Sequence, residues 1–312
     1  MRAFIFPGQG AQTIGMGRDL AQAYPAAQAV FDEVDAALGE NLSALVWEGD
    51  IETLTLTQNA QPALMATSMA AMRALEAEGI DIGACAYVAG HSLGEYAALT
   101  AAGALSVTDA ARLLRARGQA MQAAVPVGAG AMAAILGLDL AAVRAVAAEA
   151  AQGEVCEAAN DNDPAQVVIS GHKAAVERAA ELAKAAGAKR ALLLPVSAPF
   201  HCALMAPAAE AMAAALADVA IAAPRVPVVA NVRAEAVSDP DEIRRLLVEQ
   251  VTGAVRWRES VEWMAGQGVG AFWEIGAGKA LSGMVRRIHK EAEVRSVGAA
   301  ADVVAAVESL GG

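Results

Sequence analysis

The chain has 312 residues, of which 56 % are hydrophobic, and its formal net charge is −12. This length can bury a large core, no stretch has the sustained apolar character of a membrane span, and the acidic charge argues against a nucleic-acid-binding protein. The N-terminal apolar run is cut short at Pro7 and does not resemble a signal peptide. Cys85, Cys156 and Cys202 have the spacing of neither a disulfide framework nor a metal cluster. We therefore expect a cytoplasmic protein and, because no exposed apolar stripe is apparent, a monomer.

The first 127 residues alternate between strand and helix patterns. Apolar runs bounded by turn residues predict strands, and apolar positions three and four apart predict helices. The second of the helices has Pro62 in its first turn and Gly79 at its end, the usual start and stop signals. The predicted elements are a strand at 2–6, helices at about 18–38 and 62–78, a strand from Cys85 to Ala89, and helices from Glu95 to Ala102 and over about 107–124.

From Gly130 the pattern changes to a β-α-β-β-α-β order, which is that of the ferredoxin-like unit. We expect residues 128–196 to form a small subdomain inserted into a larger one. Its predicted elements are a strand from Ala131 to Leu138, a helix over 139–152, strands from Val155 to Ala159 and Gln166 to Ser170, a helix over 173–187, and a strand from Arg190 to Val196.

The remaining residues return to the larger unit. Alternating strands and helices predict an α/β core with a mostly parallel sheet, built from residues 1–127 and 197–312. The elements predicted here are a helix near 203–217, strands at 226–232 and 269–275, and a helix that ends near 290.

The most informative motif is Gly90-His91-Ser92-Leu93-Gly94, which follows a predicted strand and precedes a predicted helix. This is the layout of a nucleophile elbow, in which a serine sits on a sharp turn that only nearby glycines relieve. The following helix directs its first N–H groups toward the reacting centre. The motif therefore predicts acyl chemistry at Ser92.

A serine hydroxyl needs a base, and the chain has four histidines. His91 adjoins the nucleophile and is expected to pack or to form a hydrogen bond elsewhere. His172 is expected to cap a helix or lie on the surface, and His289 to be exposed. His201 follows a proline-rich loop where the chain re-enters the larger unit, so it is the predicted base.

No partner carboxylate is evident for this histidine. Asp161 and Asp163 lie between Ser92 and His201 in the chain, in the order that α/β-hydrolases use, but they fall in a polar loop of the small subdomain.

Arg117 lies on an apolar helix face with Ala110, Leu113, Leu114 and Met121, where a guanidinium needs an anion. Two interpretations remain open here. One is an internal salt bridge or a side chain that reaches solvent at the edge of the stripe, and the other is a clamp for a substrate carboxylate.

The Gly8-Gln9-Gly10 loop after the first strand lacks the third glycine of a dinucleotide fingerprint, since Thr13 stands in its place. Brought beside the elbow in a parallel sheet, this loop can instead supply a backbone N–H to an oxyanion hole.

With these motifs together, the chain resembles the malonyl-CoA:acyl carrier protein transacylase family, which includes the acyltransferase domains of fatty acid and polyketide synthases. The resemblance spans nearly the whole chain. It rests on Phe6–Gly10, Gln58–Pro62, Gly90–Gly94, Arg117-Gly118-Gln119 with Met121, Ser197–His201, and Glu274–Lys279.

The resemblance implies a hydrolase-like core with a ferredoxin-like subdomain, and a ping-pong transfer of malonyl from malonyl-CoA to holo acyl carrier protein with no cofactor. It implies roles for seven residues: Ser92 as nucleophile, His201 as base, Gln9 and Leu93 as backbone oxyanion donors, Arg117 as carboxylate clamp, Gln250 as the residue that orients the histidine through an amide or carbonyl, and Phe200 as a mark of malonyl selectivity. Asn160 and Asn162 are expected to border the cleft.

Two other functions are compatible with the motifs. A serine esterase or thioesterase would use water as acceptor and need an aspartate, and a non-catalytic relative would only dock carrier protein.

Two basic clusters are candidate docking sites for an acidic carrier protein, although a solvated helix face is the simpler interpretation of each. They are Arg286, Arg287 and Lys290 near the end of the last predicted helix, and the pair Lys189 and Arg190.

Overall fold

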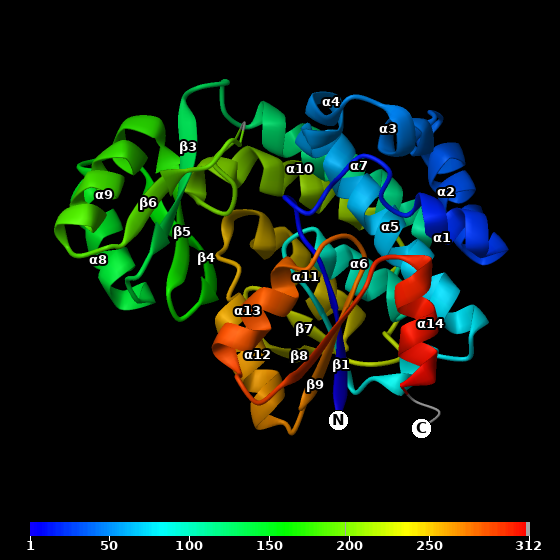
Figure 1. Cartoon of the computed structure of the whole chain (residues 1–312). Coiled ribbons are helices and arrows are strands. Elements are labelled where there is room, and N and C mark those ends of the chain that lie inside the picture. The colour runs from blue at the N-terminus through cyan, green and yellow to red at the C-terminus, as the bar shows by residue number, and fades with distance from the viewer. Residues whose placement is uncertain (197, 310–312) are drawn as a thin grey trace.

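The computed structural model describes residues 1–196 and 198–309. It contains a larger and a smaller sheet with helices packed against each, and the unit built on the smaller sheet lies to one side of the other (Figure 1). The expected α/β architecture is therefore confirmed. In the described part of the chain no helix is long and apolar enough to cross a membrane.

The larger sheet has the strand order β10-β9-β1-β2-β7-β8. All its neighbours are parallel except β7 and β8, which are antiparallel. The strands are β1 (Arg2–Phe6), β2 (Tyr87–Gly90), β7 (Val228–Ala230), β8 (Glu235–Val237), β9 (Ala271–Ile275) and β10 (Glu293–Val297).

Helices cover both faces of this sheet. Before the small unit they are α1 (Arg18–Ala23), α2 (Pro25–Leu38), α3 (Leu42–Glu48), α4 (Ile51–Thr55), α5 (Thr57–Ala77), α6 (Gly94–Ala101) and α7 (Val107–Ala123). After it they are α10 (Ala206–Ala217), α11 (Pro240–Thr252), α12 (Trp257–Gly266), α13 (Ala280–Ile288) and α14 (Ala300–Glu308). Short 3-10 turns lie at Ile82–Ala84 and Ala203–Met205.

The smaller sheet is antiparallel, with the strand order β4-β5-β3-β6. Helices α8 and α9 cover it, and their side chains form a core separate from that of the large sheet. This is the topology of the expected ferredoxin-like unit. Its elements are β3 (Gly130–Leu136), α8 (Leu140–Ala151), β4 (Cys156–Asp163), β5 (Gln166–His172), α9 (Lys173–Ala185) and β6 (Arg190–Leu193).

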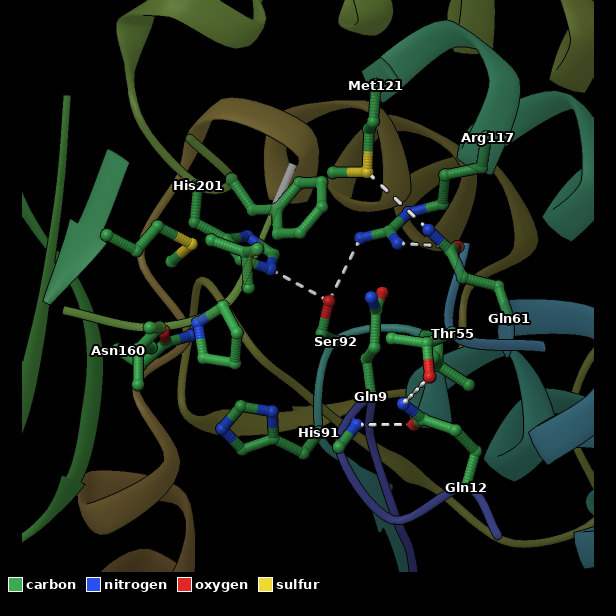
Figure 2. A pocket seen from close by; sticks show the side chains of 17 residues that line it. Gln9, Gln12, Thr55, Gln61, His91, Ser92, Arg117, Met121, Asn160 and His201 are labelled. Carbon is green, nitrogen blue, oxygen red and sulfur yellow. Dashed lines mark hydrogen bonds between the residues drawn. The ribbon is translucent and has the colours of Figure 1, made fainter. Parts of the chain in front are cut away.

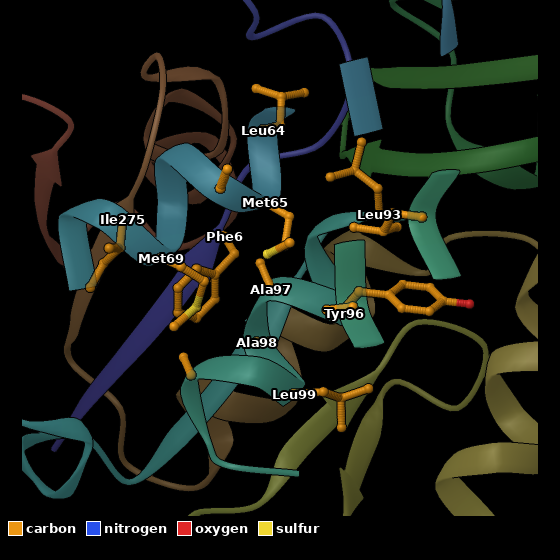
Figure 3. Packing of buried hydrophobic residues seen from close by; sticks show 14 of the residues in the cluster. Phe6, Leu64, Met65, Met69, Leu93, Tyr96, Ala97, Ala98, Leu99 and Ile275 are labelled. Atoms are coloured by element: carbon orange, nitrogen blue, oxygen red, sulfur yellow. The ribbon is translucent and has the colours of Figure 1, made fainter. Parts of the chain in front are cut away.

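Alternate residues of β1 enter two different cores, as the two-residue period of a strand requires. Phe4 and Phe6 belong to the core under α5 and α6, and Figure 3 shows Phe6 facing Met69 of α5. Ile5 belongs to the core on the other face, with Trp257 of α12. The strand is thus covered on both sides and holds the loop that follows it.

Several predicted elements differ in their bounds, and two of these differences have an identifiable reason. The helix predicted at 18–38 is two helices, because Pro25 begins the second one. The helix predicted at 62–78 begins at Thr57, which places Pro62 in its second turn; the polar residues before Pro62 are buried and so hide the apolar period. The strand predicted to end at Ala159 runs on to Asp163 as β4. Ser197, the first residue of the Ser197–His201 motif, lies outside the described residues.

Candidate active site

The elbow at Ser92 joins β2 to α6. Ser92 has a φ of 53°, a left-handed conformation that is uncommon for residues other than glycine. A Cβ atom at Gly90 would lie 1.9 Å from the backbone of Gly94, and one at Gly94 would lie 2.3 Å from the Phe6 carbonyl oxygen. The glycines on either side of the serine are therefore required by the close approach of the backbone.

Ser92 faces the predicted histidine. The Oγ of Ser92 lies 2.8 Å from Nε2 of His201, as Figure 2 shows. On the other side of the ring, Nδ1 lies 2.9 Å from the Gln250 carbonyl oxygen and 3.1 Å from that of Gly253. Because carbonyl oxygens only accept, Nδ1 carries the proton and Nε2 is free to accept one from the serine hydroxyl.

The electrostatic setting keeps this histidine neutral. Burial, together with the positive charge of Arg117, lowers the pKa of His201 to about 3. The backbone of His201 has a φ of 57°, so this residue, like Ser92, is in the left-handed region.

No carboxylate is needed to orient this ring, because backbone carbonyls take that place. Asp161 lies 2.8 Å from Arg258, and Asp163 lies 2.7 Å from Arg287. Both carboxylates are therefore engaged in ion pairs away from His201. They lie on β4 rather than in a loop, which corrects the predicted placement.

Arg117 is only 1 % exposed, and its guanidinium points toward the serine (Figure 2). It donates to the side-chain oxygens of Gln61 and Gln250 at 2.8 Å each, and to Ser92 Oγ at 3.1 Å. These acceptors are neutral, and no carboxylate of the described residues lies within ion-pair distance, so the internal salt bridge considered above is absent there. A buried cation with neutral partners is suited to bind an anionic substrate.

Two backbone N–H groups are available near the nucleophile. Gln9 and Leu93 both line the pocket that contains Ser92, and within the described residues neither backbone N–H has an acceptor. The Gln9 side chain is held by Thr57, whose hydroxyl donates to it at 2.8 Å. The pair can therefore donate to a negatively charged oxygen that forms beside the serine.

A hydrogen-bond network supports the elbow from behind. Asn231 accepts from the Ser92 backbone N–H at 2.8 Å and donates to the Gly90 carbonyl at 2.7 Å. The Gln250 amide donates to the Ser92 carbonyl at 3.0 Å and to Glu95 at 2.9 Å. Glu95 also accepts from the Asn231 backbone N–H at 3.0 Å.

The pocket is a cavity of about 410 Å³ between the elbow, α7 and the small unit. Phe200 and Asn160 line it with the residues above, whereas Asn162 is not among its lining residues. Asn162 instead lies 2.8 Å from Nε2 of His91, which is the hydrogen-bonding role expected for that histidine. His172 is the last residue of β5 and directly precedes α9. Its side chain accepts from the Val155 N–H and makes no capping hydrogen bond to the helix, contrary to one of its predicted roles.

The small unit also touches the loop that orients His201. Val255 donates to the Ala159 carbonyl at 2.8 Å, and the Asp161 N–H donates to the Val255 carbonyl at 2.9 Å. Two residues earlier, the Gly253 carbonyl faces His201. The β4 strand therefore holds one of the two acceptors of the histidine in place.

The two basic clusters differ in whether their cations form ion pairs. Arg287 is paired with the buried Asp163, so part of its role is structural. Lys290 follows the end of α13 rather than lying within it. All five cations of the two clusters are exposed, and among the described residues Arg286, Lys290, Lys189 and Arg190 form no ion pair.

Sequence reasoning missed Gln61, Asn231 and Glu95 as parts of this site. Asn231 follows β7 as Ser92 follows β2, and the carboxyl ends of neighbouring parallel strands meet at one edge, so its position was open to prediction. Gln61 lies in a quoted motif but carries no chemical signature of its own. Glu95 reads as an ordinary first-turn helix residue.

Comparison with known proteins is consistent with this geometry. Residues 3–307 match the model of the acyl transferase domain family. The chain is 52 % identical over 286 residues to the malonyl CoA-acyl carrier protein transacylase of Escherichia coli K12, which covers 92 % of each chain.

Two solved structures are similar over almost the full length. The acyl-carrier-protein-S-malonyltransferase of Bartonella henselae has a TM-score of 0.97 and 55 % identity, with 100 % of this chain and 99 % of that chain covered. A malonyl-transacylase in complex with a holo type II PKS acyl-carrier protein has a TM-score of 0.96 and 45 % identity, with 99 % of each chain covered.

Proposed function

This chain belongs to the acyl transferase family, and from that premise we propose that it transfers malonyl from malonyl-CoA to the phosphopantetheine thiol of a holo acyl carrier protein. The product would supply extender units for fatty acid or polyketide synthesis. The observation that carries the substrate choice is the buried Arg117 guanidinium, whose Nη2 lies 3.1 Å from the Ser92 hydroxyl. A carboxylate on the acyl group would replace neutral partners with a charged one.

In the first half-reaction, Ser92 Oγ attacks the thioester carbonyl of malonyl-CoA while His201 Nε2 takes its proton. The oxyanion accepts from the backbone N–H groups of Gln9 and Leu93, each of which is worth about 3 kcal/mol of barrier. The tetrahedral intermediate collapses, the C–S bond breaks, and His201 returns the proton to the CoA sulfur. The product is a malonyl ester on Ser92.

In the second half-reaction, the carrier thiol gives its proton to His201 and attacks the ester carbonyl. Collapse breaks the bond to Ser92 Oγ, and the proton passes from His201 to the serine. The Gln250 carbonyl keeps Nδ1 protonated in both directions, and Arg117 holds the malonyl carboxylate throughout. The chemistry needs no cofactor, because a thioester is already activated.

We further propose that Phe200, which lines the pocket, limits the size of the acyl group to malonyl. In this proposal residues 128–196 form the inserted small domain and residues 1–127 with 197–312 the large one. The three cysteines are buried free thiols, which fits a cytoplasmic protein, and the chain acts as a monomer.

The carrier is proposed to dock on the exposed cations of one of the two basic clusters. Lys189 and Arg190 are favoured by continuity, because the strand that begins at Arg190 leads to Leu194, which lines the pocket. Charge reversal at Lys189 and Arg190 should raise the KM for carrier protein and spare that for malonyl-CoA. Arg286 with Lys290 is the second surface to test, and Lys184→Glu on α9 is a control. Equal effects on both substrates would contradict docking at either cluster.

The transfer itself is tested by intact-mass spectrometry. The protein is mixed with malonyl-CoA, and holo carrier protein is added afterwards. A malonyl adduct that is absent in Ser92→Ala and discharges onto the carrier supports the proposal. An adduct lost to water at the same rate without carrier would indicate a thioesterase, and an adduct formed only from another acyl-CoA would change the substrate. Absence of any adduct would favour a non-catalytic carrier-binding protein.

A further inference from the structure

Glu95 is a buried carboxylate that the reaction above does not use. It is 3 % exposed and lies in the first turn of α6, three residues after the nucleophile. In the described part of the chain its hydrogen bonds come from neutral donors, the Asn231 backbone N–H and the Gln250 amide. Burying a carboxylate without a cation in contact is costly, so its place behind the elbow calls for a reason.

The Gln250 side chain lies between Glu95 and Arg117. Its Oε1 accepts from Arg117 Nη2 at 2.8 Å, and its Nε2 donates to Glu95 Oε2 at 2.9 Å, in a position with no exposure to solvent. A flipped amide would set its NH2 group against the guanidinium and its oxygen against the carboxylate. The two charges therefore specify one orientation of this amide.

That orientation determines what Arg117 can do. With Gln250 Oε1 and Gln61 Oε1 as fixed acceptors, the guanidinium is directed toward Ser92 Oγ. We infer that Glu95 is a positioning residue of the transfer reaction: acting through the Gln250 amide, it holds Arg117 in the orientation that receives the carboxylate of the acyl group. The inference rests on the proposed function and extends it to a residue that does not touch the substrate.

The charges also support one another across the amide. Burial lowers the pKa of Arg117, whereas Tyr96 and Glu95 raise it. Burial raises the pKa of Glu95 to about 7, and its hydrogen bonds with Asn231 and Gln250 and the charge of Arg117 act in the opposite direction. Without the negative charge of Glu95, the burial of the Arg117 guanidinium would cost more free energy.

The test is Glu95→Gln, which keeps the size of the side chain and removes its charge. Glu274→Gln is the matched control, because Glu274 is fully buried and accepts from the backbone N–H groups of Leu281 and Ser282, away from the pocket. The readout is the ratio of kcat/KM for malonyl-CoA to kcat/KM for acetyl-CoA. Damage to the elbow lowers both values and cancels in the ratio, whereas loss of Arg117 orientation lowers only the first.

We expect the ratio to fall about tenfold in Glu95→Gln, the size of one charge-assisted hydrogen bond, and to stay unchanged in Glu274→Gln. An unchanged or increased ratio in folded Glu95→Gln, or an equal fall in the control, would overturn the inference. Failure of the wild-type chain to acylate Ser92 with malonyl would instead overturn the proposed function, and the inference with it.

A double variant gives a second test, because it keeps one carboxylate in the buried network and so preserves the net charge that Glu95→Gln alone removes. Combining Glu95→Gln with Gln250→Glu moves the carboxylate next to Arg117. The new amide at residue 95 can accept from the Asn231 N–H and donate to the side chain of residue 250. The guanidinium should then pair directly with residue 250, and the malonyl preference should be lost. A double variant that keeps the wild-type ratio would show that the orientation of the amide is unimportant.

Discussion

Removing the Arg117 guanidinium should separate acyl transfer from carboxylate recognition. In Arg117→Ala the Ser92–His201 pair, at 2.8 Å, and the oxyanion donors stay in place, since they belong to other elements. The space left by the side chain adjoins the pocket, so water can enter and donate to the oxygens of Gln61 and Gln250. The expected defect is therefore confined to substrates with a free carboxylate.

The size of the defect follows from the bonds that are lost. A charge-assisted hydrogen bond between buried partners contributes about 1.5–3 kcal/mol, and the guanidinium can offer two to a carboxylate. Its existing bonds to Gln61, Gln250 and Ser92 must be partly exchanged for the new ones, which offsets part of the gain. A net loss of about 3 kcal/mol corresponds to a fall of about 100-fold in kcat/KM for malonyl-CoA.

The assay measures the rate of Ser92 acylation under single-turnover conditions, once with malonyl-CoA and once with acetyl-CoA. Intact-mass spectrometry is the readout. Acetyl transfer should change by less than about fivefold, because acetyl has no carboxylate to lose. Arg115→Ala is the matched control: it lies on the same helix, but its guanidinium contacts Asn59 and Glu40 away from the pocket. A fall of equal size for both acyl groups in Arg117→Ala would refute the clamp.

Three further predictions address the base, the elbow and the alternative hydrolase. Because the pKa of His201 in the folded protein is about 3, its protonated form appears only as the pH falls through that value. The rate at which a neutral phosphonate labels Ser92 should therefore stay level from about pH 8 to pH 5. A loss of labelling centred near the ordinary histidine pKa of about 6.5 would contradict this. Gly94→Ala, whose Cβ would lie 2.3 Å from a backbone oxygen, should lower the free energy of unfolding in urea by about 3 kcal/mol, whereas Gly266→Ala, with open space, should raise it by up to about 1 kcal/mol; similar values for both would refute the packing argument. Asp161→Asn and Asp163→Asn should lower the unfolding temperature, because each breaks an ion pair of a buried carboxylate, yet leave the rate of Ser92 acylation within about threefold. Loss of acylation in folded protein would favour a carboxylate-dependent hydrolase.

The strongly patterned parts of the fold were predictable from the sequence. The small unit has a regular order of short strands and amphipathic helices, and its topology is as expected. Among the elements without an expectation, α3, α4 and β10 are short, so their pattern is weak. In contrast, α11 buries Ile243, Leu246, Leu247 and Val251 at helical spacing, so this helix was open to prediction from the sequence. The polar start of α5 was missed for a different reason, since its buried polar side chains serve the site and break the apolar period.

At the site, the motifs predicted which residues take part, and the structure shows which hydrogen bonds join them. Ser92 and His201 were expected to meet, and they do, at 2.8 Å. Gln250 was expected to orient the histidine through an amide or carbonyl. Its backbone carbonyl oxygen lies 2.9 Å from His201 Nδ1, while its side chain connects Arg117 to Glu95. Backbone acceptors have no sequence signature, which is why the second one, at Gly253, was not predicted.

The contact between β4 and Val255 has a consequence for attempts to rebuild this enzyme from parts. The backbone hydrogen bonds of Val255 with Ala159 and Asp161 connect the small unit to the segment that presents the Gly253 carbonyl. Removing the small unit, or replacing it with that of another protein, would release one hydrogen-bond acceptor of His201 even if every side chain of the site were retained. A chimera would therefore have to take β4 and the segment 250–255 from the same parent protein.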